Sequence, residues 1–585
     1  MDRREFIDTV TRVAAVSAVT GPALAATEEK SPAVAPAVSP DRGQKRVLDP
    51  GAMNGAQSLL KALVDAGITT CFGNPGTSEM QLVHEIGLTD KVRPVLCLQE
   101  NIVTGAADGY GRMKGTPAFT LLHVGSGFAN GIAMLHNAGR ANTPVVNIVG
   151  ANASYHQSNY PEHELVNGRV VDLVHAVSHW SQEARSASEL GELGVKAAAL
   201  AKRGKICTVV APTDRQWETA NPPPALQPAA ARPKASAQAI KHATQMLSSG
   251  KKTALVLGNL ALEGEALEAA GRICAKTGAV LLGESFPSRL ARGEGRPPIA
   301  LIPYFYEICL SFLKPFEQLI FVGAGLPVST FAYKDKQAFK SPVSCDLFTM
   351  ASVDQDLVVA LKSLSEETGA NSLKTPRQIL AKLAPPAGEL NAVAMGQTIG
   401  MLMPENAILI DEARTGGQPI FAATQGARAH DYLSTDCGGA IGSGLPMALG
   451  AAIACPDRKT ILLQADGGGM YTVQTLWSLA RENADVVVVV LKNDAYAILE
   501  LELARVREKE ANAKMKSMFS LGNPSIDWAS VSVGLGVPAT KARTAEEFHQ
   551  QFGDALAKKG PQLIECQVAY PKAWPTFVEN IHRSR

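Results

Sequence analysis

Residues 460–496 read TILLQADGGGMYTVQTLWSLARENADVVVVVLKNDAY, and this stretch decides the fold of the chain around it. An apolar run at 460–464 ends in Ala-Asp-Gly-Gly-Gly, a helical segment extends to Asn483, and an apolar run rich in valine follows at 486–491. A strand, a crossover helix and a parallel strand place both following turns at the carboxyl edge of one sheet, where open α/β folds bind ligands. The pattern therefore predicts that Asp466 and Asn493 lie close together.

Asp466 and Asn493 offer oxygen donors that suit a hard divalent cation. A carboxylate and an amide oxygen, completed by a backbone carbonyl, fit a Mg²⁺ ion that also holds a diphosphate. The glycines at 467–469 allow close backbone approach, and the N–H groups of the following helix point toward anionic oxygens. The competing interpretation is two ordinary turns, because Asp and Asn are common at strand ends. The residues alone leave both interpretations open.

The same alternation of strands and helices recurs in three blocks from residue 49 onward. Besides the two strands above, the sequence predicts a helix at 55–66, a turn at 73–76 and strands at 94–98, 118–122, 145–149, 208–211, 254–257, 280–282, 318–322 and 407–410. Segments rich in Pro and Ala at 221–234 and 384–388 separate the blocks. This alternation predicts an α/β protein of three domains, each with a parallel sheet flanked by helices.

The composition excludes several classes of protein. The 585 residues carry 56 Lys plus Arg against 55 Asp plus Glu, a net charge of +1 that argues against a polybasic binder of nucleic acid or anionic membranes. Hydrophobic residues make up 46% and charged residues 19%, which excludes a mainly disordered chain. The nine cysteines are scattered without a CxxC pair, so neither a disulfide framework nor a zinc site is indicated.

The amino terminus resembles an export signal. Residues 1–26 contain Arg3-Arg4, a mildly apolar stretch and Ala23-Leu24-Ala25, which is typical of a twin-arginine signal, and residues 27–48 read as a linker. We therefore expect a periplasmic protein. The alternative is a disordered tail with a chance arginine pair on a cytoplasmic protein. The stretch is too short and too weakly apolar to span a bilayer stably, and no later run reaches 18 apolar residues.

Residues 466–496 resemble the thiamine diphosphate fingerprint of the acetolactate synthase and benzoylformate decarboxylase superfamily. The matching positions are Asp466-Gly467, Tyr471, Gln474, Leu476, Trp477, Asn493 and Tyr496. The resemblance implies a pyrimidine-binding domain at 49–220, a central domain at 235–383 and a diphosphate-binding domain at 389–575. It also implies that Asp466, Asn493 and the carbonyl of Ala495 bind Mg²⁺, and that Gly467, Gly468 and Tyr496 lie against the cofactor. The sequence has Ala465 and Gly468 where the family usually reads Gly-Asp-Gly-Ser, so one hydroxyl contact to phosphate is missing.

Two further segments of the third block match the family at the cofactor. Cys437-Gly-Gly439-Ala-Ile441-Gly442 matches the segment beneath the bent cofactor. By this match Ile441 would wedge between the two rings, and the Gly439 carbonyl would accept a hydrogen bond from the amino group of the pyrimidine. Read by itself, Ile441 is a core residue beside a glycine-rich turn. Thr415 and Gly416, which follow the strand at 407–410, are implied contacts of the diphosphate.

Three residues of the first block match the family's catalytic groups. Glu100, in Leu98-Gln99-Glu100-Asn101, matches the activating glutamate, a carboxylic acid in a dry site that exchanges a proton with the aminopyrimidine. His123 corresponds to a histidine of benzoylformate decarboxylase that could shuttle protons or hold the substrate carboxylate. Thr77 matches that enzyme's substrate-binding serine, and Ser78 is the neighbouring candidate. Without the resemblance, Glu100 and His123 would read as ordinary strand-end residues.

The central block matches the family only in outline. Residues 321–328 lack the third glycine of a Gly-x-Gly-x-x-Gly motif, so NAD binding is poorly supported. The chain carries no convincing flavin signature, and we do not expect FAD. Residues 329–332 contain no histidine where benzoylformate decarboxylase places its second one, so the sequence does not single out an aromatic substrate.

We therefore expect an enzyme that uses thiamine diphosphate and Mg²⁺ to decarboxylate a small 2-oxo acid without oxidation, releasing an aldehyde or joining the intermediate to a second carbonyl. The alternatives are an acetolactate synthase-like carboligase, a catalytically silent regulatory paralogue and a flavin- or nicotinamide-linked oxidoreductase. In this family the pyrimidine domain of one subunit and the diphosphate domain of another share each cofactor, which implies a homodimer or a dimer of dimers. We expect no nucleic-acid partner and no stable membrane span.

Overall fold

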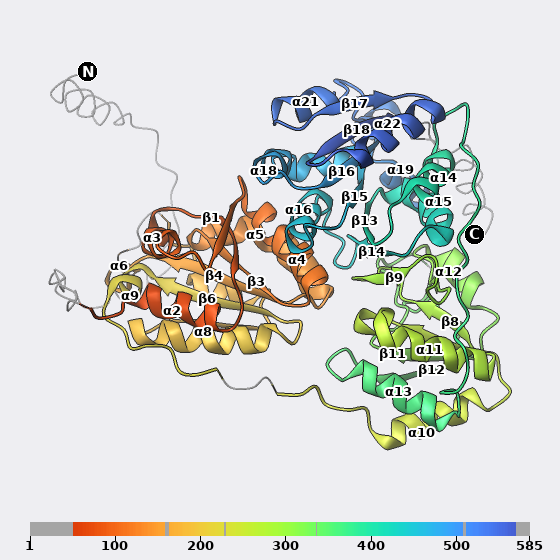
Figure 1. Cartoon of the computed structure of the whole chain (residues 1–585), viewed down its shortest axis with the longest axis horizontal. Coiled ribbons are helices and arrows are strands. Elements are labelled where there is room, and N and C mark those ends of the chain that lie inside the picture. Colours follow the sequence, from red (N-terminus) through yellow and green to blue (C-terminus); the bar gives the residue numbers. More distant parts are fainter. Residues whose placement is uncertain are drawn as a thin grey trace, which may run out of the picture. The chain divides into compact units, whose positions relative to one another are not determined.

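The computed structural model describes residues 51–157, 159, 163–226, 230–334, 336–506 and 511–568. These residues form three sheets of six, five and seven strands with helices packed against them (Figure 1), so the α/β class expected from the sequence is confirmed. The expected export signal and linker at 1–48 lie outside the described residues. Among the helices that are described, none is long and apolar enough to cross a membrane.

The first sheet is entirely parallel, in the order β2-β1-β3-β4-β6-β5. Its strands are β1 (Thr70–Asn74), β2 (Arg93–Leu96), β3 (Ala118–Leu122), β4 (Val145–Ala151), β5 (Trp180–Glu183) and β6 (Ile206–Pro212). Its helices are α2 (Gly55–Asp65), α3 (Met80–Gly87), α4 (Glu100–Lys114), α5 (Val124–Arg140), α6 (Ser154–Gln157), α7 (Val170–His175), α8 (Ala187–Ala201) and α9 (Thr213–Trp217). Neighbouring strand residues alternate between faces: Cys71 packs in the cluster under α2 and α8, and Phe72 in the cluster under α4 and α5.

The second sheet is also parallel, in the order β10-β8-β7-β11-β12. Its strands are β7 (Thr253–Leu257), β8 (Val280–Gly283), β10 (Ala300–Leu301), β11 (Gln318–Val322) and β12 (Asp346–Ala351). Its helices are α10 (Ala237–Leu247), α11 (Gly264–Thr277), α12 (Tyr306–Leu313) and α13 (Leu357–Glu367). Alternate residues of β7 and β11 fall into the two apolar clusters on either side of the sheet.

The third sheet has the order β17-β18-β16-β15-β13-β14-β9 and is parallel except for β9. Its strands are β9 (Leu290–Arg292), β13 (Ala407–Glu412), β14 (His430–Ser434), β15 (Thr460–Ala465), β16 (Val486–Lys492), β17 (Ala539–Ala542) and β18 (Gln562–Gln567). Its helices are α14 (Ala392–Leu402), α15 (Gly417–Ala423), α16 (Gly444–Ala454), α17 (Asp466–Gly469), α18 (Thr475–Arg481), α19 (Ala497–Val506), α20 (Ala513–Ser517), α21 (Trp528–Gly534) and α22 (Ala545–Ala557). Strand β9 comes from the middle of the chain, and the sequence analysis did not anticipate that it would join this sheet.

The expected strands agree with the observed ones within a few residues, and two local expectations need correction. The turn expected at 73–76 is half strand, because β1 continues to Asn74 and its Gly73 pairs with Leu96 and Leu121. The strand expected at 94–98 ends at Leu96, so Glu100 is the first residue of helix α4 and not a strand-end residue. The helix forms at that point because the side chain of Gln99 caps it, accepting from the N–H of Asn101 at 2.6 Å.

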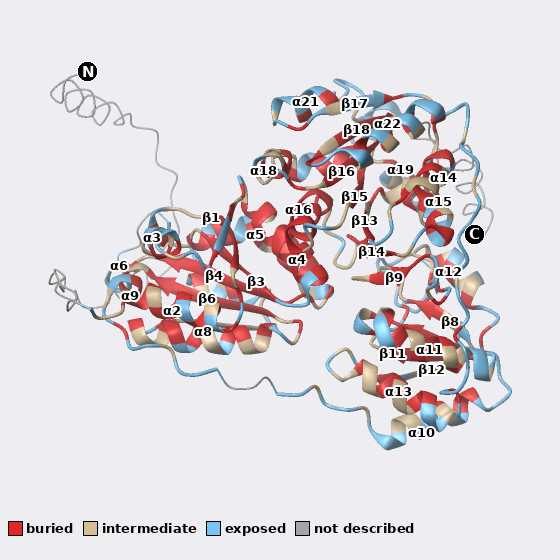
Figure 2. Ribbon diagram, in the orientation of Figure 1, coloured by how far each residue is buried: buried red, intermediate tan, exposed pale blue. Residues whose placement is uncertain are grey.

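One apolar core extends from the first sheet to the third through helices α4 and α16 (Figure 2). The two helices pack with their backbones close together, which requires glycine at the contact: a Cβ atom at Gly109 would lie 2.1 Å from the carbonyl oxygen of Met447, and one at Gly450 would lie 1.9 Å from that of Ala106. Helix α4 carries Glu100 at its start. We refer to the part of the chain around the first sheet as the first domain and to the part around the third sheet as the third domain. The packing of α4 on α16 therefore fixes Glu100 against the third domain.

Candidate active site

Glu100 lies at the N-terminus of α4 with both carboxylate oxygens occupied. Its side chain accepts a hydrogen bond from Asn74 Nδ2 at 3.1 Å on Oε1 and from Asn130 Nδ2 at 3.0 Å on Oε2. Asn74 ends β1 and Asn130 lies on α5, so three elements converge on this carboxylate. Glu100 is 9% exposed. In the described part of the chain its hydrogen-bond donors are the neutral amides of Asn74 and Asn130, which hold the carboxylate in place.

His123 forms an ion pair with a carboxylate that the sequence analysis did not single out. Its Nδ1 donates to Glu79 Oε2 at 2.9 Å, and the same oxygen accepts the N–H of Gly76 at 2.7 Å. Glu79 is completely buried. The hydrogen bond to Glu79 raises the pKa of His123, burial opposes the rise, and the charges of Glu79 and Glu100 add to it. His123 is therefore held as a cation to higher pH than a free histidine.

Glu100, His123 and the turn before Thr77 are neighbours. A Cβ atom at Gly127 would lie 3.2 Å from Glu100 Oε1 and 3.3 Å from His123 Cβ, and one at Gly76 would lie 2.4 Å from the His123 ring. Thr77 follows Gly76 and lines an open hollow of about 290 Å³ with Met80, Gln81, His84, Thr213 and Trp217. Thr77 is exposed and Ser78 is 9% exposed, so Thr77 is the more accessible hydroxyl.

The ends of β15 and β16 bring Asp466 and Asn493 together, as the crossover pattern predicts. Asp466 Oδ1 accepts the N–H of Gly467 at 2.9 Å, and Oδ2 accepts the N–H groups of Asn493 at 3.1 Å and Asp494 at 2.8 Å. Burial raises the pKa of Asp466, and these three backbone donors lower it. Asn493 Oδ1 accepts the N–H of Ala495 at 3.1 Å. The predicted metal ligands therefore share one turn cluster at the carboxyl edge of the sheet.

Two of the three glycines in the turn after β15 are required by close packing. A Cβ atom at Gly467 would lie 2.4 Å from the ring of Tyr496, and one at Gly469 would lie 2.6 Å from the ring of Trp528. Gly468 is different, because the nearest atom to its Cβ position is 3.5 Å away. The lost serine hydroxyl at Gly468 is thus not a steric necessity, whereas Gly467 is required for Tyr496 to pack beside Asp466.

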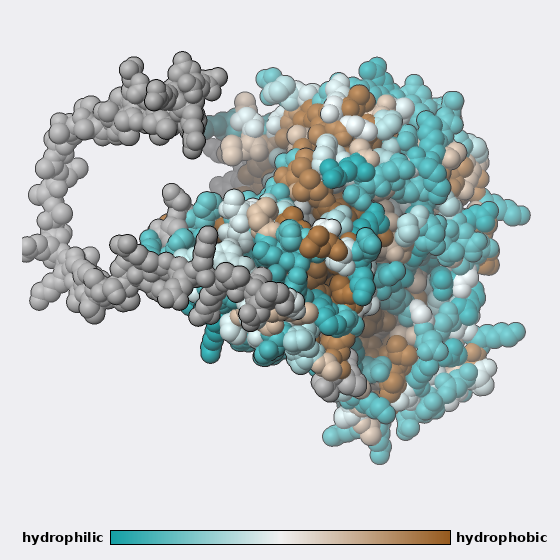
Figure 3. Space-filling view, turned by 60° about the vertical axis from the view of Figure 1, so that its left-hand side comes forward, coloured by the Kyte–Doolittle hydropathy of each residue, from teal (hydrophilic) through white to brown (hydrophobic). Residues whose placement is uncertain are grey.

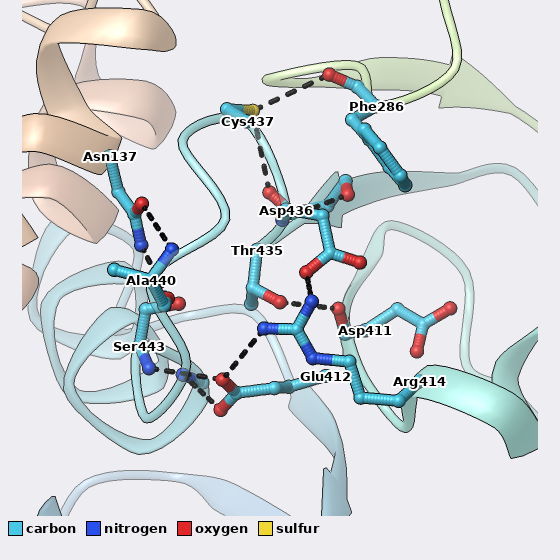
Figure 4. A network of polar contacts seen from close by, with 12 residues as sticks. Asn137, Phe286, Asp411, Glu412, Arg414, Thr435, Asp436, Cys437, Ala440 and Ser443 are labelled. Atoms are coloured by element: carbon cyan, nitrogen blue, oxygen red, sulfur yellow. Dashed lines mark hydrogen bonds and ion pairs between the residues drawn. The ribbon is translucent and has the colours of Figure 1, made fainter. Parts of the chain in front are cut away.

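A buried glutamate organises the segment expected to lie beneath the cofactor. Glu412, at the end of β13, accepts the N–H groups of Gly442 at 2.6 Å, Ser443 at 3.2 Å and Gly444 at 2.7 Å (Figure 4). Its Oε2 also accepts from Gln464 Nε2 at 2.9 Å. Within this segment Ile441 is only partly buried and Gly439 is exposed, so Ile441 is not an ordinary core residue. The sequence analysis did not single out Glu412.

Arg414 brings a positive charge to the loop of the expected diphosphate contacts. Its guanidinium forms an ion pair with Asp436 and lies 3.7 Å from Glu412 Oε1 (Figure 4). Burial lowers the pKa of Arg414, and the neighbouring carboxylates of Glu412 and Asp411 oppose this. Its Nε and Nη2 atoms are buried without a hydrogen-bond partner in the described chain. Thr415 and Gly416 follow in the same short 3₁₀ turn and are partly exposed.

These residues fit thiamine diphosphate and Mg²⁺ by their donor chemistry. Asp466, the amide of Asn493 and the backbone at Ala495 are oxygen donors of the kind that Mg²⁺ prefers. No group of three or more His, Cys, Asp or Glu side chains that could hold a metal ion is found in the described ranges, so a metal would rely on amide or carbonyl oxygens. The hydrogen bonds of Glu100 and His123 stay in the first domain, and those of Asp466 and Glu412 in the third. Among the described residues, no hydrogen bond joins Glu100 or His123 to Asp466 or Glu412.

Comparison with known proteins adds independent information. A family model described as "Thiamine pyrophosphate enzyme, N-terminal TPP binding domain" matches residues 53–174, and one described as "Thiamine pyrophosphate enzyme, C-terminal TPP binding domain" matches residues 416–566. The Mycobacterium tuberculosis protein named "Putative acetolactate synthase large subunit IlvX" is 39% identical over 519 residues, which cover 88% of this chain and 99% of that protein. Benzoylformate decarboxylase of Pseudomonas aeruginosa is 28% identical over 528 residues, covering 85% and 96% of the two chains.

A solved structure supports the same fold. Rhodococcus jostii RHA1 thiamine diphosphate-dependent 4-hydroxybenzoylformate decarboxylase superposes with a TM-score of 0.76 at 24% identity, covering 89% of this chain and 100% of that one. At this level of identity the likeness establishes the architecture alone.

Proposed function

This chain belongs to the family of thiamine pyrophosphate enzymes, and on that basis we propose that it decarboxylates a 2-oxo acid without oxidation, with thiamine diphosphate and Mg²⁺ as cofactors. The single observation that carries the proposal is the environment of Glu100. The neutral amides of Asn74 and Asn130 hold this buried carboxyl group in a fixed position, which is what an activating acid needs.

Each cluster has a distinct role in this proposal. Thiamine diphosphate, when bound, supplies the carbanion that attacks the 2-oxo acid and accepts the electron pair left as carbon dioxide departs. Glu100 moves the proton that activates the cofactor. Asp466, Asn493 and the carbonyl of Ala495 hold Mg²⁺, while Thr415, Gly416 and the turn at 467–468 hold the diphosphate. Gly439, Ile441 and Tyr496 orient the cofactor from the third domain.

His123 and Thr77 favour decarboxylation followed by protonation. His123 lies beside Glu100, and in its protonated form it can hold the substrate carboxylate or return a proton to the product. Thr77 offers an accessible hydroxyl for the same carboxylate. The relatives named benzoylformate decarboxylase, at 28% identity, and alpha-keto-acid decarboxylase, at 26%, support this assignment. Carboligation is the second candidate, supported by the 39% identity to a protein named as an acetolactate synthase subunit.

The test is a panel of 2-oxo acids with thiamine diphosphate and Mg²⁺. The panel includes aliphatic, aromatic and cationic members, and the assay follows release of carbon dioxide and analyses products for aldehyde or 2-hydroxyketone. We expect turnover of at least one member, and we expect Glu100→Gln to lower it by about 10²–10⁴-fold while the cofactor still binds. Cofactor binding without any turnover would instead favour a silent paralogue. Unchanged turnover in Glu100→Gln would refute the role of Glu100.

We further propose that two chains build each site in a homodimer or a dimer of dimers. Exposed apolar side chains adjoin the site residues in sequence, namely Leu98 at 43%, Met470 at 37%, Tyr471 at 55% and Leu499 at 43% exposure. Apolar residues also interrupt the hydrophilic surface in Figure 3. Such surface is typical of a contact that a partner covers.

Complementation tests this arrangement. Glu100→Gln and Asp466→Ala chains are each expected to be inactive, but a mixed dimer retains one site with both residues intact if the domains come from different chains. Random reassociation should then restore about one quarter of wild-type activity, because half of the dimers are mixed and each has one intact site of two. Absence of recovery, with mixed dimers demonstrated by mass, would place the site within one chain.

For localisation we propose export by the twin-arginine route, supported by the sequence of residues 1–26. Arg3→Lys together with Arg4→Lys should remove the protein from the periplasm of the expressing cell. A periplasmic fraction unchanged by this double substitution would favour the cytoplasmic alternative.

A further inference from the structure

The segment between β14 and α16 is held in an unusual conformation. Gly439 has φ of +81° and Gly442 has φ of +89°, in the left-handed region that favours glycine. Glycine-rich backbone loses much conformational entropy when one conformation is fixed, so such a segment needs strong external contacts. The proposed cofactor contacts, Gly439 and Ile441, lie within it.

Its own domain secures the second half of the segment. Glu412 accepts the N–H groups of Gly442 at 2.6 Å and Gly444 at 2.7 Å, and Thr472 Oγ1 donates to the carbonyl of Gly442 at 2.6 Å. Both Glu412 and Thr472 are buried. Residues 442–444 are therefore fixed by the third domain itself.

The first domain secures the other half through Asn137 of α5 (Figure 4). Asn137 Nδ2 donates to the carbonyl of Ala440 at 2.8 Å, and Asn137 Oδ1 accepts the N–H of Ala440 at 3.1 Å. Asn137 is completely buried, and a Cβ atom at Gly438 would lie 2.5 Å from its Oδ1. The neighbouring His136 donates from Nε2 to the carbonyl of Gly438 at 3.1 Å. Two consecutive residues of α5 thus bind the peptide groups on both sides of Gly439.

Gly439 itself remains open. Among the described residues, no atom outside Gly439 and its two chain neighbours lies within 4 Å of its Cβ position, and the residue is exposed. Helix α5 also carries Asn130, which donates to Glu100 at 3.0 Å and lies two helical turns from Asn137. The same helix therefore contacts the activating carboxylate and the segment expected to hold the cofactor's pyrimidine.

We propose that Asn137 is a positioning residue for thiamine diphosphate: it fixes the peptide of Ala440, and with it the orientation of the Gly439 carbonyl, before the cofactor binds. The inference rests on the proposed function. A preformed segment does not have to be ordered at the moment of binding, so the benefit falls on affinity for the cofactor and not on the proton transfers at Glu100. In the shared site proposed above, each chain would use its own first domain to shape the half-site that it offers to its partner.

Isothermal calorimetry of thiamine diphosphate binding at saturating Mg²⁺ tests the proposal. Asn137→Ala should raise Kd about tenfold, equivalent to about 1.4 kcal/mol, and kcat at saturating cofactor should stay within about twofold of wild type. His136→Ala should raise Kd by a smaller factor of about three. His136 is exposed, so this substitution leaves no cavity in the core and the variant should fold. Amide exchange of residues 438–440 in the cofactor-free protein should accelerate in both variants.

Asn147→Ala is the matched control. Asn147 is also completely buried in the first domain and makes two side-chain hydrogen bonds, accepting from Thr120 at 2.8 Å and donating to Thr208 at 3.0 Å, both within its own sheet. It should lower stability without changing Kd. An unchanged Kd in Asn137→Ala and His136→Ala, or an equal rise in Asn147→Ala, would overturn the proposal. If the wild-type protein itself binds no thiamine diphosphate, the proposed function fails instead.

The mixed dimers give a second, directional test. Asn137→Ala placed on the Glu100→Gln chain perturbs the segment that serves the one intact site, so the cofactor concentration needed for half-maximal activity should rise about tenfold. The same substitution on the Asp466→Ala chain perturbs only the disabled site and should have no effect. Equal effects from both placements would contradict the proposal that Asn137 positions Ala440 of its own chain.

Discussion

Replacing Glu79 by Gln removes the negative charge of this side chain and leaves its size and shape nearly unchanged. The carboxylate is completely buried, Oε2 accepts from Gly76 and His123, and Oε1 has no hydrogen-bond partner among the described residues. A Cβ atom at Gly150 would lie 1.6 Å from Oε1, so the Glu79 side chain packs directly on the backbone of Gly150, and Gln, which has nearly the same size, keeps this packing. In the variant the amide oxygen must occupy the Oε2 position to keep both donors, which leaves the amide NH₂ facing Gly150 without a partner.

The loss of unfolding free energy in Glu79→Gln has a constant part and a part that depends on pH. An unpaired buried N–H group costs about 1–3 kcal/mol at every pH. A hydrogen bond to a charged group contributes about 1.5–3 kcal/mol and a neutral one about 0.5–1.5 kcal/mol, so losing the charge costs about 1 kcal/mol more while His123 is protonated. The His123 side chain is 19% exposed, and water screens its ion pair with Glu79. We therefore use about 1 kcal/mol, the smaller of the differences between the charged and the neutral hydrogen bond.

The direction of the pH dependence follows from the raised pKa of His123. Its pKa lies above the ordinary value of 6.5, chiefly because of the hydrogen bond to Glu79. The stabilisation from this pair is therefore fully present below pH 6.5 and is lost as pH rises through the pKa of the folded protein. The difference between wild type and Glu79→Gln should be largest at acidic pH and shrink at alkaline pH.

Thermal unfolding between pH 5.5 and 9 measures this difference. Unfolding entropy is about 2.1 cal/mol/K per residue, so in the compact unit of residues 46–585 about 1 kcal/mol shifts Tm by about 1 °C. The limb of the rate profile that requires protonated His123 should also move to lower pH in the variant. Asp214→Asn is the control, because Asp214 is likewise buried in the first domain but its partners are Ser154, at 2.9 and 2.6 Å, and Arg215, which stays charged across this pH range. A Tm difference for Glu79→Gln that is constant across the pH range, with an unmoved rate profile, would refute the reasoning.

Two further predictions concern the metal site and the contact between domains. Asp466→Ala removes the one expected carboxylate ligand, so affinity for thiamine diphosphate in the presence of Mg²⁺, measured by calorimetry, should fall more than about 100-fold; Asp554→Ala, at an exposed position of the same domain, should leave it unchanged. Arg112 and Asp108 form an ion pair in which both side chains are 1% exposed. Arg112→Met leaves the buried Asp108 carboxylate unpaired, so the free energy of denaturant unfolding should fall by about 3–5 kcal/mol. Adding Asp108→Asn should restore part of this loss. Arg169→Met breaks an ion pair whose arginine is 57% exposed and should cost about 0–1 kcal/mol; a similar loss in both variants would contradict the burial argument.

Much of the fold follows from local sequence patterns. The apolar runs that predict strands at 118–122 and 318–322 coincide with β3 and β11, because short buried segments between turn residues have few other ways to satisfy their backbone. The crossover rule brought Asp466 and Asn493 to one edge of the third sheet, where Asp466 accepts the N–H of Asn493 at 3.1 Å. The pairing of β9 with β14 has no comparable local signal, since β9 has only three residues.

Several site residues emerged only from the structure. Glu79 directly follows the candidates Thr77 and Ser78, yet its contact with His123 spans 44 positions of sequence. Glu412 reaches Gly442 across 30 positions, and Asn137 reaches Ala440 across 303. The sequence does not show which residue a Glu or Asn side chain will contact, because the same residue types also cap helices and end turns.

The sequence by itself determined the alternation of strands and helices, the position of many of the strands, the family fingerprint and the residue types available for a cofactor, because these depend on spacing along the chain. Tertiary structure decided which groups are paired, which are open and which are held in place. Helix α5 shows the difference: the sequence analysis singled out none of its residues, but packing places Asn130 on Glu100 and Asn137 on Ala440. Such contacts depend on how two domains fit together, and that fit is set by cores built from residues hundreds of positions apart.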